Sequence, residues 1–270
     1  MPVAELGDLS LHYKEHGEGP PVLGVMGFGL DQRFWATQIP AVIRSHRFIT
    51  FDNRGLGRSS RHSATTIDEM ADDAVRLLDH LGIDKTVVFG VSMGGAIAQR
   101  LVLDHPDRVS ALILAVTWAR PIEFMRRQTV LARDIIERRG SEGMMEAALL
   151  WMFTPRFFEL GRETIDRMVA AFMADTGPDA AASEVLLGQL DAIQKHDTLE
   201  ELPKISCPTL VLGGKSDMMV PGFASEEIAA AIPGAELRMF ETGHGCMVEE
   251  MDAFNDRVAS FLSGLERLAP

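Results

Sequence analysis

The sequence predicts an α/β fold with a mostly parallel central sheet, helices on both of its faces and a helical block inserted into the chain. Two observations lead to this prediction. Short apolar segments alternate with longer segments of helical periodicity, which is typical of βαβ units. Between residues 118 and 202 this alternation stops and the sequence is helix-like throughout. The 270 residues are enough to form one such domain.

The predicted strands are short apolar runs bounded by turn residues. They cover residues 9–13, 21–26, 48–52, 86–91, 111–116, 209–213 and 236–241. Helical periodicity covers residues 68–81, 93–104, 224–231 and 253–265. Because crossovers between parallel strands are right-handed, we expect these helices to cover both faces of the sheet.

The helical insert is predicted to be a cap fixed to the sheet domain. No Gly/Ser linker sets it apart, so we assign residues 118–202 to the cap and residues 1–117 and 203–270 to the core. Its methionine and aromatic side chains pack the cap onto the core in the simplest interpretation, and as a group they also suit the lining of an apolar pocket. These residues are Met125, Met144, Met145, Trp151, Met152, Phe153, Phe157, Phe158, Met168, Phe172 and Met173.

The charge balance argues against binding to nucleic acid or to an anionic membrane. The chain carries 39 acidic and 26 basic residues, and the formal net charge of −13 repels phosphate groups. The first residues lack the pattern of a signal peptide, and no apolar run approaches the roughly 18 residues that a membrane helix needs. We therefore expect a cytoplasmic protein in which Cys207 and Cys246 are reduced and bind no metal. The oligomeric state, a homodimer included, is left open.

Ser92 is the predicted nucleophile because it lies on a sharp turn between an apolar strand and a helix. The segment Gly90-Val91-Ser92-Met93-Gly94 places glycines two residues to either side of the serine, where only glycine lets the strand and the helix approach closely. The N-terminal amides of the following helix favour negative charge beside the serine. The alternative is a glycine-rich turn in which the serine has no role.

A serine nucleophile needs a base to take its proton and a carboxylate to orient that base. His244 is the predicted base, because it follows a predicted strand at the carboxyl edge of the sheet and precedes a helix. Asp217 follows the neighbouring strand at the same edge and is the predicted acid, although a turn or helix-capping role also suits it. The chain order Ser, Asp, His favours the triad. We expect the other seven histidines, His12, His16, His46, His62, His80, His105 and His196, to be surface residues without a partner.

The oxyanion of a tetrahedral intermediate needs two backbone N–H donors. One is expected from Met93, directly after the nucleophile, and the other from Phe28 in the glycine-rich loop after the strand at residues 21–26. A plain glycine turn is the alternative for this loop. For the substrate pocket we expect Met26, Trp118, Trp151 and Met152.

These motifs together resemble the α/β-hydrolase superfamily, in particular its esterase, lactonase and non-haem haloperoxidase-like members. The resemblance rests on residues 26–29, 52–59, 90–94, 213–221 and 243–255 and covers nearly the whole chain. It implies a mostly parallel sheet of eight strands, a helical cap between the sixth and seventh strands, and no cofactor. It also implies the triad Ser92, Asp217 and His244, the oxyanion donors Phe28 and Met93, and a structural role for residues 52–59.

Two positions depart from the family pattern. Met26 stands where the family usually has a histidine whose side chain braces the oxyanion loop, and methionine cannot make those hydrogen bonds. Met251 stands where proline is usual, which affects only the start of the last helix.

The resulting functional hypothesis is a serine hydrolase that cleaves a carboxylic ester or lactone of a small to medium apolar molecule through an acyl-enzyme on Ser92. The same triad suits a carbon–carbon bond hydrolase of the β-diketone type, a perhydrolase or an acyltransferase, since the fold alone does not choose a substrate. A receptor that keeps the fold and binds a ligand without turning it over is the alternative outside enzymes. For each of these enzymes the expected partner is a small-molecule substrate.

Overall fold

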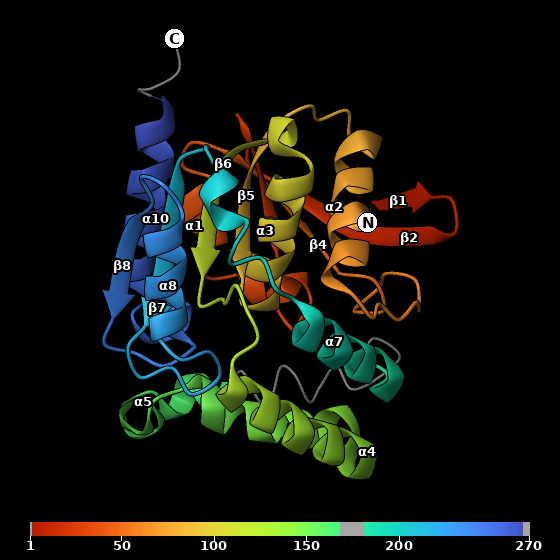
Figure 1. Ribbon diagram of the computed structural model, residues 1–270, viewed down its shortest axis with the longest axis vertical. Coiled ribbons are helices and arrows are strands. Elements are labelled where there is room, and N and C mark those ends of the chain that lie inside the picture. Colours follow the sequence, from red (N-terminus) through yellow and green to blue (C-terminus); the bar gives the residue numbers. More distant parts are fainter. Residues whose placement is uncertain (1, 168–180, 267–270) are drawn as a thin grey trace.

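An eight-stranded sheet forms the centre of the computed structural model, which describes residues 2–167 and 181–266 (Figure 1). The strand order is β1-β2-β4-β3-β5-β6-β7-β8. Strands β1 and β2 pair antiparallel, as do β2 and β4, and the remaining pairs are parallel. The bounds are β1 (Val3–Leu6), β2 (Leu9–His16), β3 (Pro21–Val25), β4 (Arg47–Phe51), β5 (Thr86–Val91), β6 (Val109–Ala115), β7 (Thr209–Gly214) and β8 (Glu236–Phe240). The predicted mostly parallel sheet is thus confirmed.

The inner strands are buried on both faces, which explains why they are continuous apolar runs in the sequence. Every residue of β5 and of β7 is buried, as expected for parallel strands covered by helices on each side. The edge strand β1 was not predicted. Of its four residues only Ala4 is buried, so its sequence carries almost none of the apolar periodicity that identifies a strand.

Helices cover both faces of the sheet, as predicted. One face is covered by α2 (Ile67–His80), α3 (Met93–Asp104) and α8 (Phe223–Ala231), and the other by α1 (Ile39–Val42) and α10 (Met251–Glu266) (Figure 1). Helix α2 begins one residue before the predicted start because the Thr66 side chain caps the backbone N–H of Glu69, which in turn caps Thr66. Short turns of helix complete the core at η1 (Gln32–Trp35), η2 (Pro106–Arg108), η3 (Leu202–Lys204) and α9 (Cys246–Glu249).

The cap lies across the end of the sheet toward which the parallel strands point (Figure 1). Its described helices are α4 (Glu123–Met152), α5 (Pro155–Leu160) and α7 (Ser183–Lys195), and α4 is interrupted at Gly140, whose φ is 64°. Helices α4 and α7 pack on each other through Ala132, Ile136, Met144, Ala148, Leu186 and Leu190. Met168, Phe172 and Met173 lie outside the described residues.

The two connections between cap and core are hydrogen-bonded to each other and to α3. The backbone N–H of Thr198 donates to Ala119 O at 2.7 Å, and the Thr198 hydroxyl donates to Gln99 Oε1 at 2.7 Å. Gln99 in turn donates from Nε2 to Trp118 O at 3.0 Å. His196 lies against the Trp118 ring, with the ring centroids 5.9 Å apart and edge to face. The cap is therefore fixed to α3, the helix that follows Ser92.

The prediction that seven histidines are surface residues is wrong for three of them. His12, His46 and His196 are buried, whereas the other four are exposed or half-buried. His12 sits in β2 with Asp52, forty residues later, 3.0 Å from its Nδ1. Partners that distant in sequence leave no local signal. Burial, assisted by the charge of Arg100, lowers the pKa of His196 to about 4.

The lowered pKa of His196 predicts a loss of stability in mild acid. Below about pH 6.5 the unfolded chain binds a proton on this histidine, while the folded protein does so only near its lowered pKa. The folded state therefore loses on the order of 3 kcal/mol as the pH falls from about 6.5 to about 4. We expect His196→Gln to remove this part of the pH dependence, measured as the change in unfolding free energy between about pH 7 and about pH 4.5. Parallel pH curves for the two proteins would contradict the assignment.

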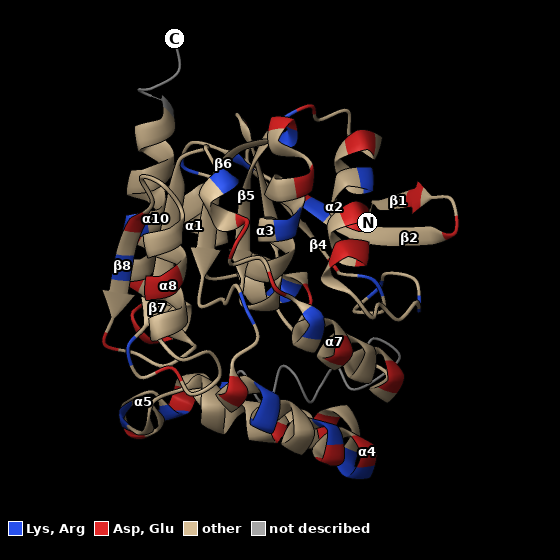
Figure 2. Cartoon of the chain, viewed as in Figure 1, with Lys and Arg blue, Asp and Glu red and all other residues tan. Residues whose placement is uncertain are grey.

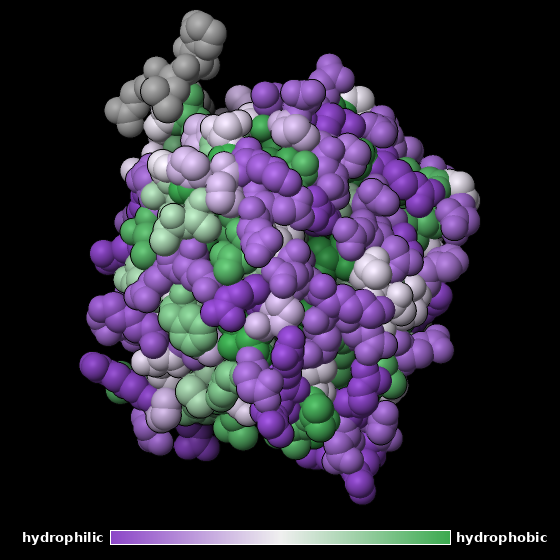
Figure 3. Space-filling view, viewed as in Figure 1, coloured by the Kyte–Doolittle hydropathy of each residue, from purple (hydrophilic) through white to green (hydrophobic). Residues whose placement is uncertain are grey.

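The surface is mixed in charge and mostly polar. Lys and Arg alternate with Asp and Glu along α4 (Figure 2). Hydrophilic side chains cover most of the face drawn in Figure 3, with apolar side chains in separate small groups. Within the described residues, no helix combines the length and the apolar character that crossing a bilayer requires. Cys207 and Cys246 are both free thiols.

Candidate active site

Ser92 occupies a strained turn between β5 and α3. Its φ of 56° and ψ of −120° lie outside the regions that L-residues ordinarily adopt. The flanking glycines are required by close approach: a Cβ on Gly90 would lie 2.3 Å from Gly94 O, and one on Gly94 would lie 2.0 Å from Val25 O. The predicted strand, turn and helix are all present. The turn places the serine at the end of the sheet that the cap covers.

The end of β6 supports the turn at Ser92 from one side. The Ser92 N–H donates to Ala115 O at 2.8 Å, and the Thr117 hydroxyl donates to Ser92 O at 2.8 Å. Between these two residues Val116 has a φ of 48°, which is rare for a β-branched residue. The chain turns at Val116, so that the residues on both sides of it are hydrogen-bonded to Ser92. Sequence reasoning missed this support, since nothing local distinguishes Val116 or Thr117 from other residues at a strand end.

His244 and Asp217 form a buried pair at the ends of neighbouring strands. Asp217 follows β7 and His244 follows β8, and Asp217 Oδ2 lies 2.7 Å from His244 Nδ1. The other carboxylate oxygen, Oδ1, accepts the backbone N–H groups of Met219 at 2.7 Å and Val220 at 2.8 Å. Three hydrogen bonds thus hold the carboxylate, which in turn orients the imidazole through Nδ1.

The histidine loop is tied to the cap. Glu249 accepts the Gly243 N–H at 2.9 Å through Oε1, and its Oε2 accepts the Thr154 hydroxyl of the cap at 2.5 Å. The Gly245 N–H also donates to the cap, to Met152 O at 2.8 Å. The residues on both sides of His244 are therefore fixed by contacts to the segment that joins α4 to α5. Glu249 was not predicted to have this role, because its partners are distant in the sequence.

Ser92 and His244 line one cavity together, so the structure brings the three predicted triad residues to the same edge of the sheet. The loop at residues 26–29 borders this cavity too. A Cβ on Gly27 would lie 3.1 Å from Ser92 Cβ, so the loop passes directly beside Ser92. In the described part of the chain, the backbone N–H groups of Phe28 and Met93 have no acceptor within the protein. Both are therefore available to an oxyanion at Ser92.

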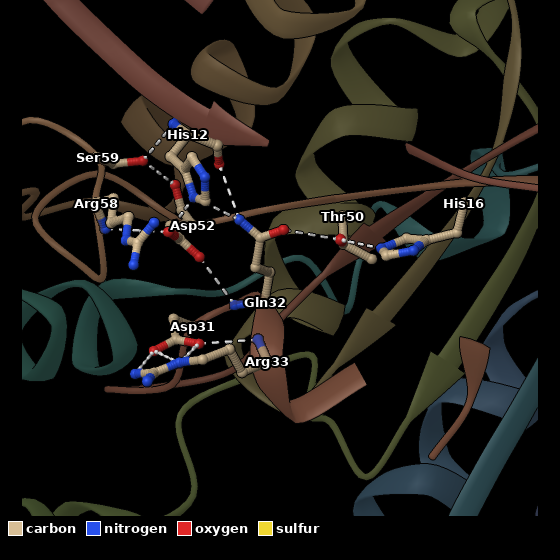
Figure 4. Close-up of polar contacts among 9 residues, drawn as sticks. All are labelled: His12, His16, Asp31, Gln32, Arg33, Thr50, Asp52, Arg58 and Ser59. Atoms are coloured by element: carbon tan, nitrogen blue, oxygen red, sulfur yellow. Dashed lines mark hydrogen bonds and ion pairs between the residues drawn. The ribbon is translucent and has the colours of Figure 1, made fainter. Parts of the chain in front are cut away.

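The backbone of this loop is held from the core side by the segment that follows β4. Asn53 donates from Nδ2 to Met26 O at 3.0 Å, so the loop is braced through its main chain at the position where the side chain is a methionine. The preceding residue, Asp52, fixes this segment through its carboxylate, which accepts the N–H groups of Gln32 at 3.0 Å and Arg58 at 3.1 Å (Figure 4). This network gives residues 52–59 a structural role beside the site.

All four residues predicted for the substrate pocket border cavities that Ser92 also lines. Trp118 and Trp151 line a cavity that reaches Ser92 beneath the cap. Met26 and Met152 line the cavity that Ser92 shares with His244. Phe28 and Met219 border both cavities and a third one beside them. Of the charged side chains that the structure describes, not one lines any of these three cavities.

Comparison with known proteins decides the family. The sequence matches the family described as alpha/beta hydrolase fold over residues 20–250. The chain belongs to this family. A relative in Azorhizobium caulinodans named "Putative carbamate hydrolase RutD" is 32% identical to this hydrolase over 269 residues, which are 99% of this chain and 100% of the relative.

Solved structures of similar proteins agree with this assignment. The enol-lactonase from Burkholderia xenovorans LB400 matches this hydrolase with a TM-score of 0.86 and 29% identity, over 97% of this chain and 100% of the other. A thermophilic esterase from Thermogutta terrifontis matches with a TM-score of 0.84 and 29% identity, over 95% of this chain and 94% of the other. The family and fold predicted from the sequence are thus confirmed. Among the residues that the structure describes, no group of three or more His, Cys, Asp or Glu could hold a metal ion.

Proposed function

We propose that this hydrolase cleaves an uncharged carboxylic ester or lactone of a small to medium apolar molecule through an acyl-enzyme on Ser92. The observation that carries the proposal is the position of Ser92, which borders two cavities whose linings are apolar apart from a few uncharged polar groups and His244. A substrate can therefore place one apolar arm on each side of its reacting carbonyl. Burial of a charged group in either cavity would leave it without a counter-charge from the described residues.

The geometry supports an acyl-transfer mechanism. His244 takes the proton of the Ser92 hydroxyl as its oxygen attacks the carbonyl carbon, and Asp217 holds the imidazole in the tautomer that allows this. The N–H groups of Phe28 and Met93 donate hydrogen bonds to the carbonyl oxygen as negative charge develops on it. His244 then gives its proton to the departing alkoxide. Water, deprotonated by His244, attacks the acyl carbon and releases the acid and free Ser92.

The lining of the first cavity at Ser92 supports an apolar arm on the substrate. Trp118 and Met125 border the first cavity and favour an aliphatic or aromatic arm by contact with their apolar surfaces.

A carbamate is the second candidate substrate. The name of the Azorhizobium caulinodans relative favours it, because that protein is 32% identical over almost the full length of both chains. A carbamate carbonyl would react at the same triad. It carries nitrogen on one side, however, and that nitrogen would enter one of the two largely apolar cavities.

A panel of matched activated esters tests the proposal. We expect a neutral p-nitrophenyl butyrate to have a kcat/KM at least about 100-fold above that of p-nitrophenyl hemisuccinate, because the hemisuccinate must bury an unpaired carboxylate. A neutral lactone and a neutral phenyl carbamate extend the panel to the competing bonds. The proposal is wrong if the carboxylate ester is turned over as well as the neutral one, and turnover of the carbamate alone would favour the second candidate.

A further inference from the structure

A polar side chain lies in the middle of the apolar face of α7. Leu186, Leu190 and Ile193 follow helical spacing, and all three take part in the packing of α7 against α4 and against Phe28. Gln189 lies within this face, and only 1% of its surface is exposed. A buried amide on an apolar face lowers stability unless its polar atoms have partners.

The partner of Gln189 is the oxyanion loop. The N–H of Gly29 donates to Gln189 Oε1 at 2.9 Å, across 160 residues of sequence. Gly29 has a φ of 67°, and a Cβ there would lie 3.1 Å from the side chain of Leu186. Gly29 is thus pressed against α7 by packing and held there by one hydrogen bond.

The loop is consequently held on both sides of Phe28. Asn53 holds the carbonyl of Met26 from the core, and Gln189 holds the N–H of Gly29 from the cap. Phe28 lies between these two points. The direction of the Phe28 N–H therefore depends on both of these points.

The rest of the Gln189 side chain is poorly suited to stabilising the protein. Its Nε2 is buried and has no hydrogen-bond partner among the described residues. A methionine of similar length would fill the same space without burying an unpaired amide. What glutamine provides here and methionine does not is therefore the Oε1 acceptor for the N–H of Gly29.

We propose that Gln189 is a positioning residue for the oxyanion hole, through which the cap sets the direction of the Phe28 N–H. This inference rests on the proposed acyl-transfer function of Ser92. It makes the cap part of the catalytic machinery as well as a wall of the substrate cavity. Gln189 should therefore contribute to binding of the transition state and not to binding of the substrate.

Gln189→Met tests the inference, because it removes the acceptor and keeps the packing. We expect kcat on a neutral ester to fall by about 10- to 100-fold with KM changed by less than about threefold, since a misdirected donor weakens the transition state alone. The inhibition constant of a trifluoromethyl ketone, which forms an oxyanion on Ser92, should rise by a similar factor. The melting temperature should stay close to that of the wild type.

Ser63→Ala is the matched control. The Ser63 hydroxyl donates to Glu184 O at 3.2 Å, so this variant removes another hydrogen bond between α7 and the core without touching the oxyanion loop. We expect its kcat and its ketone inhibition to match the wild type. Equal losses in both variants would show that general loosening of the cap is responsible, and wild-type kcat in Gln189→Met would overturn the inference directly.

The labelling rate of Ser92 by a fluorophosphonate separates this inference from the choice of substrate. The phosphonyl oxygen occupies the same hole, so Gln189→Met should label about 10-fold or more slowly than the wild type and Ser63→Ala should not. A wild-type protein that labels at Ser92 but hydrolyses no ester refutes the proposed substrate and leaves the inference to be decided by these rates. Equal labelling rates for wild type and Gln189→Met refute the inference alone.

Discussion

Ser92→Ala is expected to lower kcat on neutral esters by about 10⁵-fold or more, because it removes the only atom in the site that the proposed mechanism makes covalent to the substrate. Labelling by a fluorophosphonate should be lost in the same variant. The measurements are initial rates on a p-nitrophenyl ester and the intact mass of the protein after exposure to the probe. The residual rate reports what the oxyanion donors and the cavity achieve without a nucleophile.

Ser92→Gly is the companion variant, because it separates the loss of the hydroxyl from the strain in the backbone. Alanine keeps the Cβ that makes a φ of 56° costly, whereas glycine adopts this conformation readily. Both variants should be inactive. The free energy of unfolding of the glycine variant should exceed that of the alanine variant by about 1 kcal/mol or more. Chemical unfolding of the two proteins measures this difference.

Two outcomes would contradict the role of Ser92. Substantial turnover by Ser92→Ala would place the nucleophile elsewhere. Wild-type protein that takes up no fluorophosphonate and hydrolyses no member of the ester panel would favour a receptor with this fold, in which the cavities bind a ligand without reaction.

The turn that carries Ser92 could be predicted from the sequence because its structure is local. The strand, the glycines on each side of Ser92 and the helix lie within about twenty consecutive residues, and the close approach of Gly90 to Gly94 imposes a pattern that is visible in the sequence. The same holds for the buried strands β5 and β7, whose continuous apolar runs follow from helices on both of their faces.

His244 and Asp217 are a different case, since twenty-seven residues separate them. Their meeting could be expected because parallel neighbouring strands end at one edge of the sheet, so that residues just after β7 and β8 converge. Predicting that Asp217 and His244 meet therefore required the order of the strands in the sheet. The alternation of apolar strands with helices was enough to predict that β7 and β8 are parallel.

The contacts that hold the site in place could not be predicted. Gln189 reaches Gly29 across the cap, and Glu249 joins Gly243 to Thr154. Each depends on where the cap lies over the sheet, which no local pattern encodes. The buried His12 was misjudged for the same reason: its partner Asp52 is brought to it by the pairing of β2 with β4.

Asp217→Asn is expected to lower kcat by about 10³- to 10⁴-fold while the protein stays folded. The reason lies in the hydrogen bonds of the carboxylate. Oδ1 accepts the N–H groups of Met219 and Val220, so the asparagine must keep its carbonyl oxygen there and turn its NH₂ group toward His244. An NH₂ group beside Nδ1 stabilises the tautomer with the proton on Nε2, and this tautomer cannot take the proton of Ser92.

The second buried His–Asp pair of the chain provides the control for this variant. Asp52 lies 3.0 Å from His12 and accepts backbone N–H groups as Asp217 does, but neither Asp52 nor His12 borders the cavities at Ser92. The same exchange, Asp52→Asn, should therefore lower kcat far less than Asp217→Asn does, because Asp52 reaches the site only indirectly, through the segment that contains Asn53. Asp52→Asn should lower the free energy of unfolding more than Asp217→Asn does. Steady-state kinetics and urea unfolding of the two variants measure both quantities. Near-normal turnover in Asp217→Asn would mean that another group orients His244, and the Ser-His-Asp assignment would have to be revised at its acid.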